Sequence, residues 1–278
     1  MPSMMPMPTR VALLLVTALA TASCSDDPAG PAAQSPALPP LASLQADMTL
    51  FDGAAGAAAL PTAASSSAGV HFLTAAVTAG IARTATVAVM AVPVATFAAA
   101  ASVDPVFEDG AFHWRYSIVS DGATFVADLA GRGAGAESMW EMRITTNATN
   151  PPLDGFLWYD GRAQLTGQAG EWHIYDATQA SASVELLAVG WTHPSVDAWT
   201  LSFTNVNPAS ADVGDVLTYE VAGTLRTMRF HDASAGTDTV IEWHSATGTG
   251  SIHAPGYNGG ERACWDAAQN NTPCGSAP

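Results

Sequence analysis

The chain has 278 residues and a formal net charge of −16 at pH 7, and every basic residue is an arginine. An acidic surface repels the phosphate backbone of nucleic acids and offers no polybasic grip on anionic lipid headgroups. We therefore expect no nucleic-acid partner and no charge-driven membrane binding. The length is sufficient for one large β domain or two smaller ones.

The first residues are typical of an export signal. Arg10 precedes an uncharged apolar run, residues 11–20, which is too short to span a bilayer and has the length of a signal-peptide core. Small residues then lead to Cys24, and the chain becomes polar directly after it. We expect residues 1–23 to be a signal peptide. An ordinary secretory signal cut near Ala22, with Cys24 an incidental thiol, is the alternative.

The end of this segment resembles the lipobox of bacterial lipoproteins. The match is Ala-Thr-Ala-Ser-Cys over residues 20–24, and Thr21 departs from the Leu or Val that is usual there. The resemblance implies that Cys24 is acylated, becomes the first mature residue and anchors the chain in the cell envelope, at the outer membrane. Asp26 and Asp27 are similar to acidic signals for display on the cell surface, but they also fit the start of a soluble linker, so the membrane face stays undecided.

Residues 24–45 are rich in Pro, Ala and Ser, which predicts a flexible tether behind the anchor. Residues 46–103 are rich in alanine. From Val70, apolar residues recur at steps of three and four, which is helical periodicity, until Pro93 interrupts the pattern. A second short helix is predicted over residues 97–101, so we expect a helical pair packed on the following domain. The apolar stripe that should face this domain is Leu73, Val77, Ile81, Thr84, Val87 and Ala91.

The same segment offers a second candidate for membrane contact. Residues 84–103 are uncharged, but eight of the twenty are the weakly apolar alanine, and Pro93 is central. A chain anchored through Cys24 needs no second anchor. A packed helical pair is therefore favoured over a membrane-inserted segment.

Residues 104–278 change to strand patterns, and all eight tryptophans lie there. Apolar and polar residues alternate over 112–118, 140–144 and 199–204, which is typical of antiparallel strands with one buried face and one wet face. Turn clusters separate about ten such runs. The predicted fold is mainly β: a large curled antiparallel meander, or half-open barrel, of about ten strands, with the alanine-rich helical pair packed on it.

Two cysteines stand near the C-terminus. Cys264 and Cys274 form an even pair in an exported chain, and they lack the C-x-x-C spacing of a metal or redox pair. We expect a disulfide that pins the C-terminal tail.

The order of these features resembles an uncharacterised family of secreted bacterial β-rich lipoproteins. The likeness covers roughly residues 70–274: the helical pair, the aromatic strands around Trp158-Tyr159-Asp160-Gly161 and Gly170–Asp176, and the terminal Cys264-Trp265-Asp266 with Cys274. It implies no catalytic residues. A looser likeness, in architecture alone, is to the lipoprotein-localisation carriers, in which a curled sheet with a helical plug holds acyl chains.

Patterns for catalysis are weak. The sequence has no G-x-S-x-G or H-E-x-x-H motif, and the glycine-rich residues 131–135 are predicted to form a hairpin loop between strands. We expect no metal and no cofactor. His231, His244 and His253 could converge on Zn²⁺, but their aromatic neighbours occupy the apolar face, which favours solvated imidazoles. A glycoside-hydrolase acid pair could come from a set of strand and turn carboxylates, although no pair stands out: Glu141, Asp160, Glu185, Glu220 and Glu242.

Three functions follow from these observations. The first is a lipid-anchored envelope protein with a non-enzymatic binding or structural β domain, which meets the membrane through Cys24 and an envelope protein or an apolar ligand through the domain. The second is a carrier or sensor of an apolar ligand held between sheet and helices. The third is a glycoside hydrolase or a carbohydrate-binding module with an exposed aromatic row.

Overall fold

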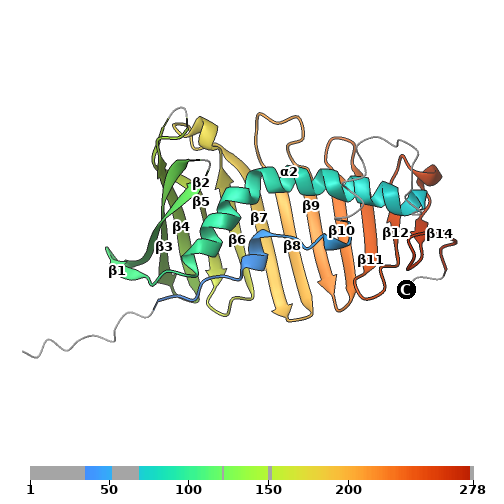
Figure 1. Cartoon of the computed structure of the whole chain (residues 1–278), viewed down its shortest axis with the longest axis horizontal. Coiled ribbons are helices and arrows are strands. Elements are labelled where there is room, and N and C mark those ends of the chain that lie inside the picture. Colours follow the sequence, from blue (N-terminus) through green and yellow to red (C-terminus); the bar gives the residue numbers. More distant parts are fainter. Residues whose placement is uncertain (1–34, 52–68, 121, 150–151, 276–278) are drawn as a thin grey trace, which may run out of the picture. The chain divides into compact units, whose positions relative to one another are not determined.

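The computed structural model describes residues 35–51, 69–120, 122–149 and 152–275. Its centre is one antiparallel sheet of fourteen strands that follow each other in chain order (Figure 1). The strands are β1 (Val106–Glu108), β2 (Ala111–Ser120), β3 (Ala123–Ala134), β4 (Glu137–Thr146), β5 (Leu153–Gln164), β6 (Ala169–Tyr175), β7 (Glu185–Ser195), β8 (Ala198–Asn205), β9 (Val216–Ala222), β10 (Leu225–Asp232), β11 (Thr237–His244), β12 (Gly250–His253), β13 (Ala263–Trp265) and β14 (Asn271–Thr272).

The mainly-β antiparallel meander is confirmed, and two finer predictions are wrong. There are fourteen strands rather than about ten, because β1, β13 and β14 have only two or three residues each and leave no alternating pattern. The sheet is also open rather than curled, with β1 and β14 at its edges. A second layer explains why it need not close: a helix of 31 residues, about 46 Å long along its axis, covers one face.

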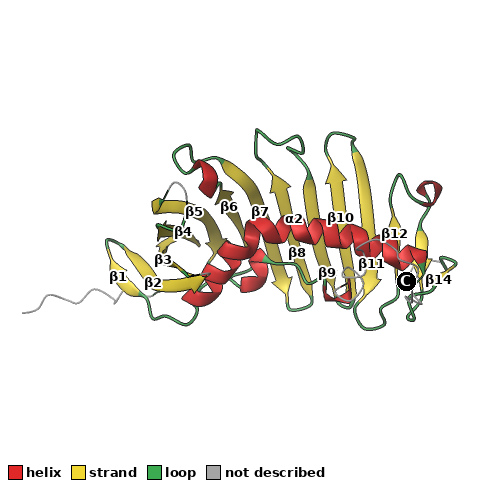
Figure 2. Cartoon of the chain, turned by 45° about the horizontal axis from the view of Figure 1, so that its top comes forward, coloured by secondary structure: helices red, strands yellow, loops and turns green. Residues whose placement is uncertain are grey.

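This helix, α2 (Val70–Ala100), crosses the strands on one face of the sheet (Figures 1 and 2). It consists of two arms, Val70–Thr84 and Val89–Ala100, that meet at a bend of 57°. The expected helical pair is therefore present, but its break lies one turn before Pro93. Proline has no N–H to donate to the carbonyl four residues earlier and its ring crowds that carbonyl, so a bend falls on the N-terminal side of the proline.

The N-terminal segment, residues 35–51, lies beside α2 on the same face of the sheet and includes the 3₁₀ turns η1 (Leu41–Leu44) and η2 (Thr49–Phe51). Leu44, Met48 and Phe51 are buried. The Phe51 ring packs 5.1 Å from the ring of Trp243 on β11. Part of the segment predicted as a tether is thus an ordered piece of the core layer. The two remaining 3₁₀ turns connect strands: η3 (Ala177–Gln179) and η4 (Asn258–Gly260).

Tryptophan–glycine pairs fill the covered face. Gly131 lies directly opposite Trp140, and Gly161 lies opposite Trp172 in the neighbouring strand pair. A Cβ at position 131 would be 2.5 Å from the Trp140 ring, so only glycine leaves room for the indole to lie flat across the strand. The same pairing recurs for Gly170 with Trp191 and for Gly250 with Trp265.

Two predictions are corrected by this packing. Gly131 and Gly133 lie inside β3, and only Gly135 of the predicted loop lies at the turn; at position 131 the glycine provides space for the Trp140 ring. The α2 stripe is also inverted: Val77 and Ile81 are exposed, and Phe72 and Ala76 face the sheet. Small side chains let the helix approach a sheet that already presents large indoles, which leaves the branched residues outside.

Candidate functional site

A groove of about 530 Å³ lies between the second arm of α2 and the N-terminal segment. Phe203 of β8 lies at its floor, Leu44 and Met48 form one wall, and Met90 and Val94 form the other. The volume lies within the range of about 300–1,000 Å³ that is typical of small-molecule pockets, and the lining is mainly apolar, as such pockets usually are. The remaining lining residues are Ala42, Gln45, Ala46, Asp47, Thr49, Arg83, Thr86 and Ala91.

Buried contacts on both sides fix the N-terminal wall of the groove. The indole N–H of Trp172 donates to the Ser43 hydroxyl over 3.2 Å, and both side chains are fully buried. Farther along, the Phe51 ring lies 5.8 Å from the ring of Phe72 on α2. The wall is therefore tied to the sheet and to the helix, and the groove is largely preformed.

Polar groups lie at the rim of this groove. The Asp47 carboxylate accepts a hydrogen bond from the Thr49 N–H over 3.1 Å, and the Thr86 hydroxyl donates to the carbonyl of Ala82 over 2.9 Å. Arg83 is exposed and reaches the same rim. An apolar interior with a polar edge suits a molecule with a hydrocarbon part and a small polar end.

The second arm of α2 is held by Tyr116 of β2. The Tyr116 hydroxyl donates to the carbonyl of Thr96, and the Thr96 hydroxyl donates to the carbonyl of Pro93 over 3.0 Å. Burial raises the pKa of Tyr116 and of its neighbour Tyr159 well above the usual value, so both phenols stay protonated and able to donate. The wall of the groove that contains Met90 and Val94 is thus fixed just beyond the proline.

The opposite face of the sheet is polar and carries rows of ion pairs. The His173 ring bonds to the Glu185 carboxylate over 2.7 Å, and Asp160 is its direct cross-strand neighbour. Burial is the largest single effect on the pKa of His173 and lowers it, but the Glu185 bond and the negative charges of Glu185, Asp160 and Glu171 together outweigh burial, so the net pKa lies above its usual value. Burial raises the pKa of Asp160, and the Glu141 carboxylate adds to this effect.

Several of the acidic residues that the sequence suggested for a glycoside-hydrolase pair form hydrogen bonds or ion pairs along this flat face. Glu141 lies directly across from Asp160 and bonds to Arg143 over 3.2 Å. Glu242 forms an ion pair with Arg262. These contacts form a solvated ladder of charges, in which Glu141, Asp160 and Glu185 are neighbours, since both glutamates raise the pKa of Asp160, whereas Glu220 and Glu242 lie farther along the sheet on β9 and β11. Most large aromatic rings face the helix layer instead; Tyr175 lies on the polar face beside Asp160, and Phe107 is the one strongly exposed ring on the strands described.

The three histidines of the last long strands do not converge. His231 bonds to Asp238 over 2.7 Å, whereas His244 pairs with Leu225 at the other end of β10. The imidazole of His253 contacts the carbonyl of Gly260 over 3.0 Å. Over residues 35–51 and 69–275, with their short gaps, no group of three His, Cys, Asp or Glu side chains is arranged to hold a metal ion.

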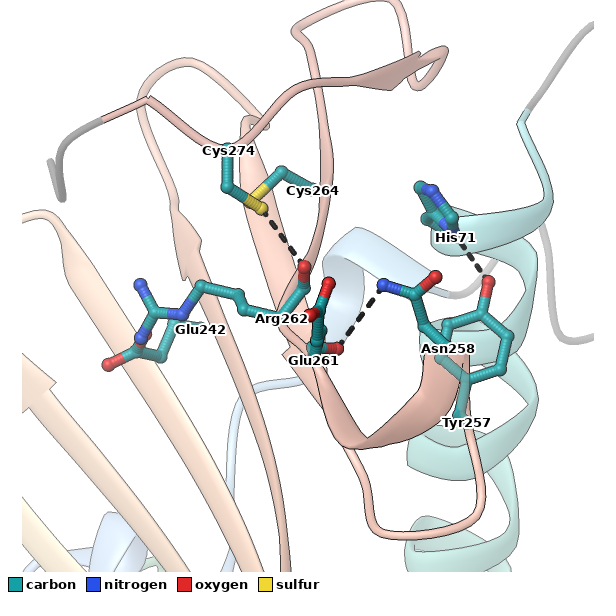
Figure 3. Close-up of a disulfide and its surroundings, with 8 residues drawn as sticks. All are labelled: His71, Glu242, Tyr257, Asn258, Glu261, Arg262, Cys264 and Cys274. Atoms are coloured by element: carbon teal, nitrogen blue, oxygen red, sulfur yellow. Dashed lines mark hydrogen bonds and ion pairs between the residues drawn. A yellow bond between two sulfur atoms is a disulfide. The ribbon is translucent and has the colours of Figure 1, made fainter.

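The C-terminal cysteines are bridged, as predicted, and the bridge lies beside the start of α2 (Figure 3). The Asn271 side chain of β14 accepts a hydrogen bond from the His71 N–H over 3.0 Å, which caps the helix from 200 residues away. The Tyr257 hydroxyl lies 2.6 Å from the His71 ring. Sequence reasoning missed this cap because it looks for capping residues next to the helix, and the neighbour here is Gly69.

Cys24, the predicted lipidation site, lies outside the described residues, together with the signal peptide. Among the helices described, none is by itself long and apolar enough to cross a membrane, whereas the two arms of α2 together reach that length and composition. Comparisons with protein-family models, curated proteins and solved structures find no match to this chain.

Proposed function

We propose that this chain is a lipid-anchored protein of the bacterial envelope whose β domain binds an apolar ligand in the groove between α2 and residues 42–49. The groove is the observation that carries the proposal, because it combines an apolar lining, a suitable volume and walls fixed by buried contacts. A binding role also gives a reason for the bend of α2, because the groove lies beside that bend. The membrane attachment remains the acyl chain expected on Cys24.

The ligand class follows from the lining. Methionine and branched aliphatic side chains such as Met48, Met90 and Val94 adapt to flexible hydrocarbon chains. Polar groups occur at the rim and not at the floor, so the polar end of the ligand would face water. A fatty acid or a lipid acyl chain fits this pattern better than a sugar, which needs hydrogen-bond partners along its length.

Two alanines on one helix face offer a matched test. Ala91 and Ala98 are both exposed and lie two turns apart on the second arm, but only Ala91 lines the groove. Ala91→Trp should fill the mouth and weaken binding of a fluorescent sixteen-carbon fatty acid by more than about tenfold, whereas Ala98→Trp should leave it unchanged. Native mass spectrometry of the wild-type chain purified without detergent would identify a resident ligand. Equal affinities for both variants, or no binding and no added mass for the wild type, would reject the groove as the site.

A further inference from the structure

The outward side of α2 is apolar although it faces solvent. Val70, Val77 and Ile81 have exposed fractions of 55%, 41% and 67%, and they recur at steps of seven and four along the first arm. Exposed alanines continue this side along the second arm at positions 91, 95 and 98. We call these six residues the outer face of α2. An exposed aliphatic face of this length on an acidic protein indicates a contact surface.

Charge is segregated around this face. Between Asp52 and Asp104 the only charged residue in the sequence is Arg83, in a chain that has 25 acidic residues. The ion-pair ladders lie on the opposite side of the sheet, for example Arg115 with Asp128 and Arg229 with Asp238. The domain therefore has one side suited to water and one side on which α2 carries no carboxylate, with Asp47 at the rim of the groove beside it.

The beginning of the described chain lies on the same side. Leu38, Leu41 and Leu44 pack into the layer that contains α2, and Ser35 precedes them. Cys24 stands eleven positions before Ser35, and eleven residues span at most about 40 Å when fully extended. An acyl anchor on Cys24 would thus keep the domain within reach of the bilayer from its helical side.

We propose that the outer face of α2 rests on the lipid surface to which the chain is anchored. This inference rests on the anchor proposed above and adds an orientation to it: the helix layer faces the bilayer and the charged sheet face points away. Exposed Ala91 and Arg83 line the groove, so its mouth opens beside the contact surface. A hydrocarbon ligand can then pass between bilayer and groove without crossing water, which is the costly step for an apolar chain.

A labelling experiment on the full chain tests this orientation. Ile81→Cys and Val119→Cys carry the same environment-sensitive nitrobenzoxadiazole label at two strongly exposed positions, the second on the polar side of β2. The native cysteines do not compete, because two are bridged and Cys24 is acylated in the proposal. Label reduction by dithionite is compared between the lipidated chain on phosphatidylcholine vesicles and the Cys24→Ala form in buffer.

We expect reduction at position 81 to slow by at least about fivefold on vesicles, and reduction at position 119 to be unchanged. If the protein floats with the vesicles but both labels react equally fast, the anchor holds and the orientation is wrong. A label at position 81 that is already shielded in buffer would also overturn the inference, because a second copy or another part of the chain would then cover the face. If the lipid-modified form fails to float, the anchor fails, and the orientation fails with it.

Discussion

The C-terminal disulfide should stabilise more than the tail that contains it. Cys264 and Cys274 are ten positions apart, and the loop-entropy relation for a ring of this size gives about 2–3 kcal/mol in the free energy of unfolding. In this fold the ring also carries Asn271, which caps the first turn of α2. Loss of such a cap costs about 1 kcal/mol. Replacing both cysteines by serine should therefore lower the unfolding free energy and also loosen the helix.

Thermal unfolding and hydrogen exchange separate these two effects. For a domain of this size we expect the double serine variant to unfold about 5–10 °C lower than the wild type, with faster amide exchange over residues 70–75. Asn271→Ala should speed the same amides while the bridge stays intact, and Asn270→Ala is the control, because Asn270 uses its backbone N–H and not its side chain in this turn. If the serine variant exchanges like the wild type at the start of α2, the bridge pins only the tail and the coupling to the helix is refuted.

Three further predictions concern the anchor, the core and the charged face. Cys24→Ala should move the protein from the detergent phase to the aqueous phase after lysis; partitioning into detergent despite the change would point to residues 84–103 as the anchor. Gly131→Ala places a Cβ against the Trp140 ring and should cost about 1–3 kcal/mol of unfolding free energy in denaturant titrations, whereas Gly133→Ala, on the same side of β3 with open space around it, should cost well under 1 kcal/mol. The Glu185 carboxylate helps to raise the pKa of His173, so the ion pair stabilises the fold fully below the unfolded-state pKa of this histidine and is lost as pH rises through the folded-state pKa. An NMR titration of His173 should give a midpoint above the usual histidine pKa, and the midpoint should fall in Glu185→Gln. An unchanged midpoint in this variant would show that Glu185 does not stabilise the protonated ring.

Period-two patterns predicted most of the sheet correctly, because strands such as β4 alternate strictly between one covered and one wet face. Burial along Glu137–Thr146 follows that alternation at nearly every residue. The number and spacing of the cysteines located the disulfide, since an even pair in an exported chain usually bridges. It could not reveal that the sheet remains open, because the closure of a meander depends on whether a second layer covers it, and this layer comes from residues far away in the chain.

The groove was harder to predict, and the reason lies in α2. Hydrophobic periodicity assumes that the largest apolar residues face the core, and on this helix Ile81 and Val77 face outward while Ala75, Ala76 and Ala79 face the sheet. The assumption fails because the indoles of the sheet already fill the interior, so a helix with small side chains packs best against them. The bend before Pro93 changes the direction of the helix, and Met90 and Val94 just beyond it line the groove.

The inversion of this helix connects the two proposals. A soluble protein with no apolar partner gains nothing from three branched residues in water, and charged or polar residues at those positions would keep the same alanine contact with the sheet. The chain instead keeps Val70, Val77 and Ile81 outside, on the side where the groove opens and from which the N-terminal segment leads back toward Cys24. One helix thus combines a tightly packed inner side, a bend that creates a binding groove, and an outer face that suits lipid. Replacing Ile81 by aspartate should therefore weaken the contact with phosphatidylcholine vesicles. The groove and the fold should stay intact, so fatty-acid affinity and thermal unfolding of the same variant should match the wild type.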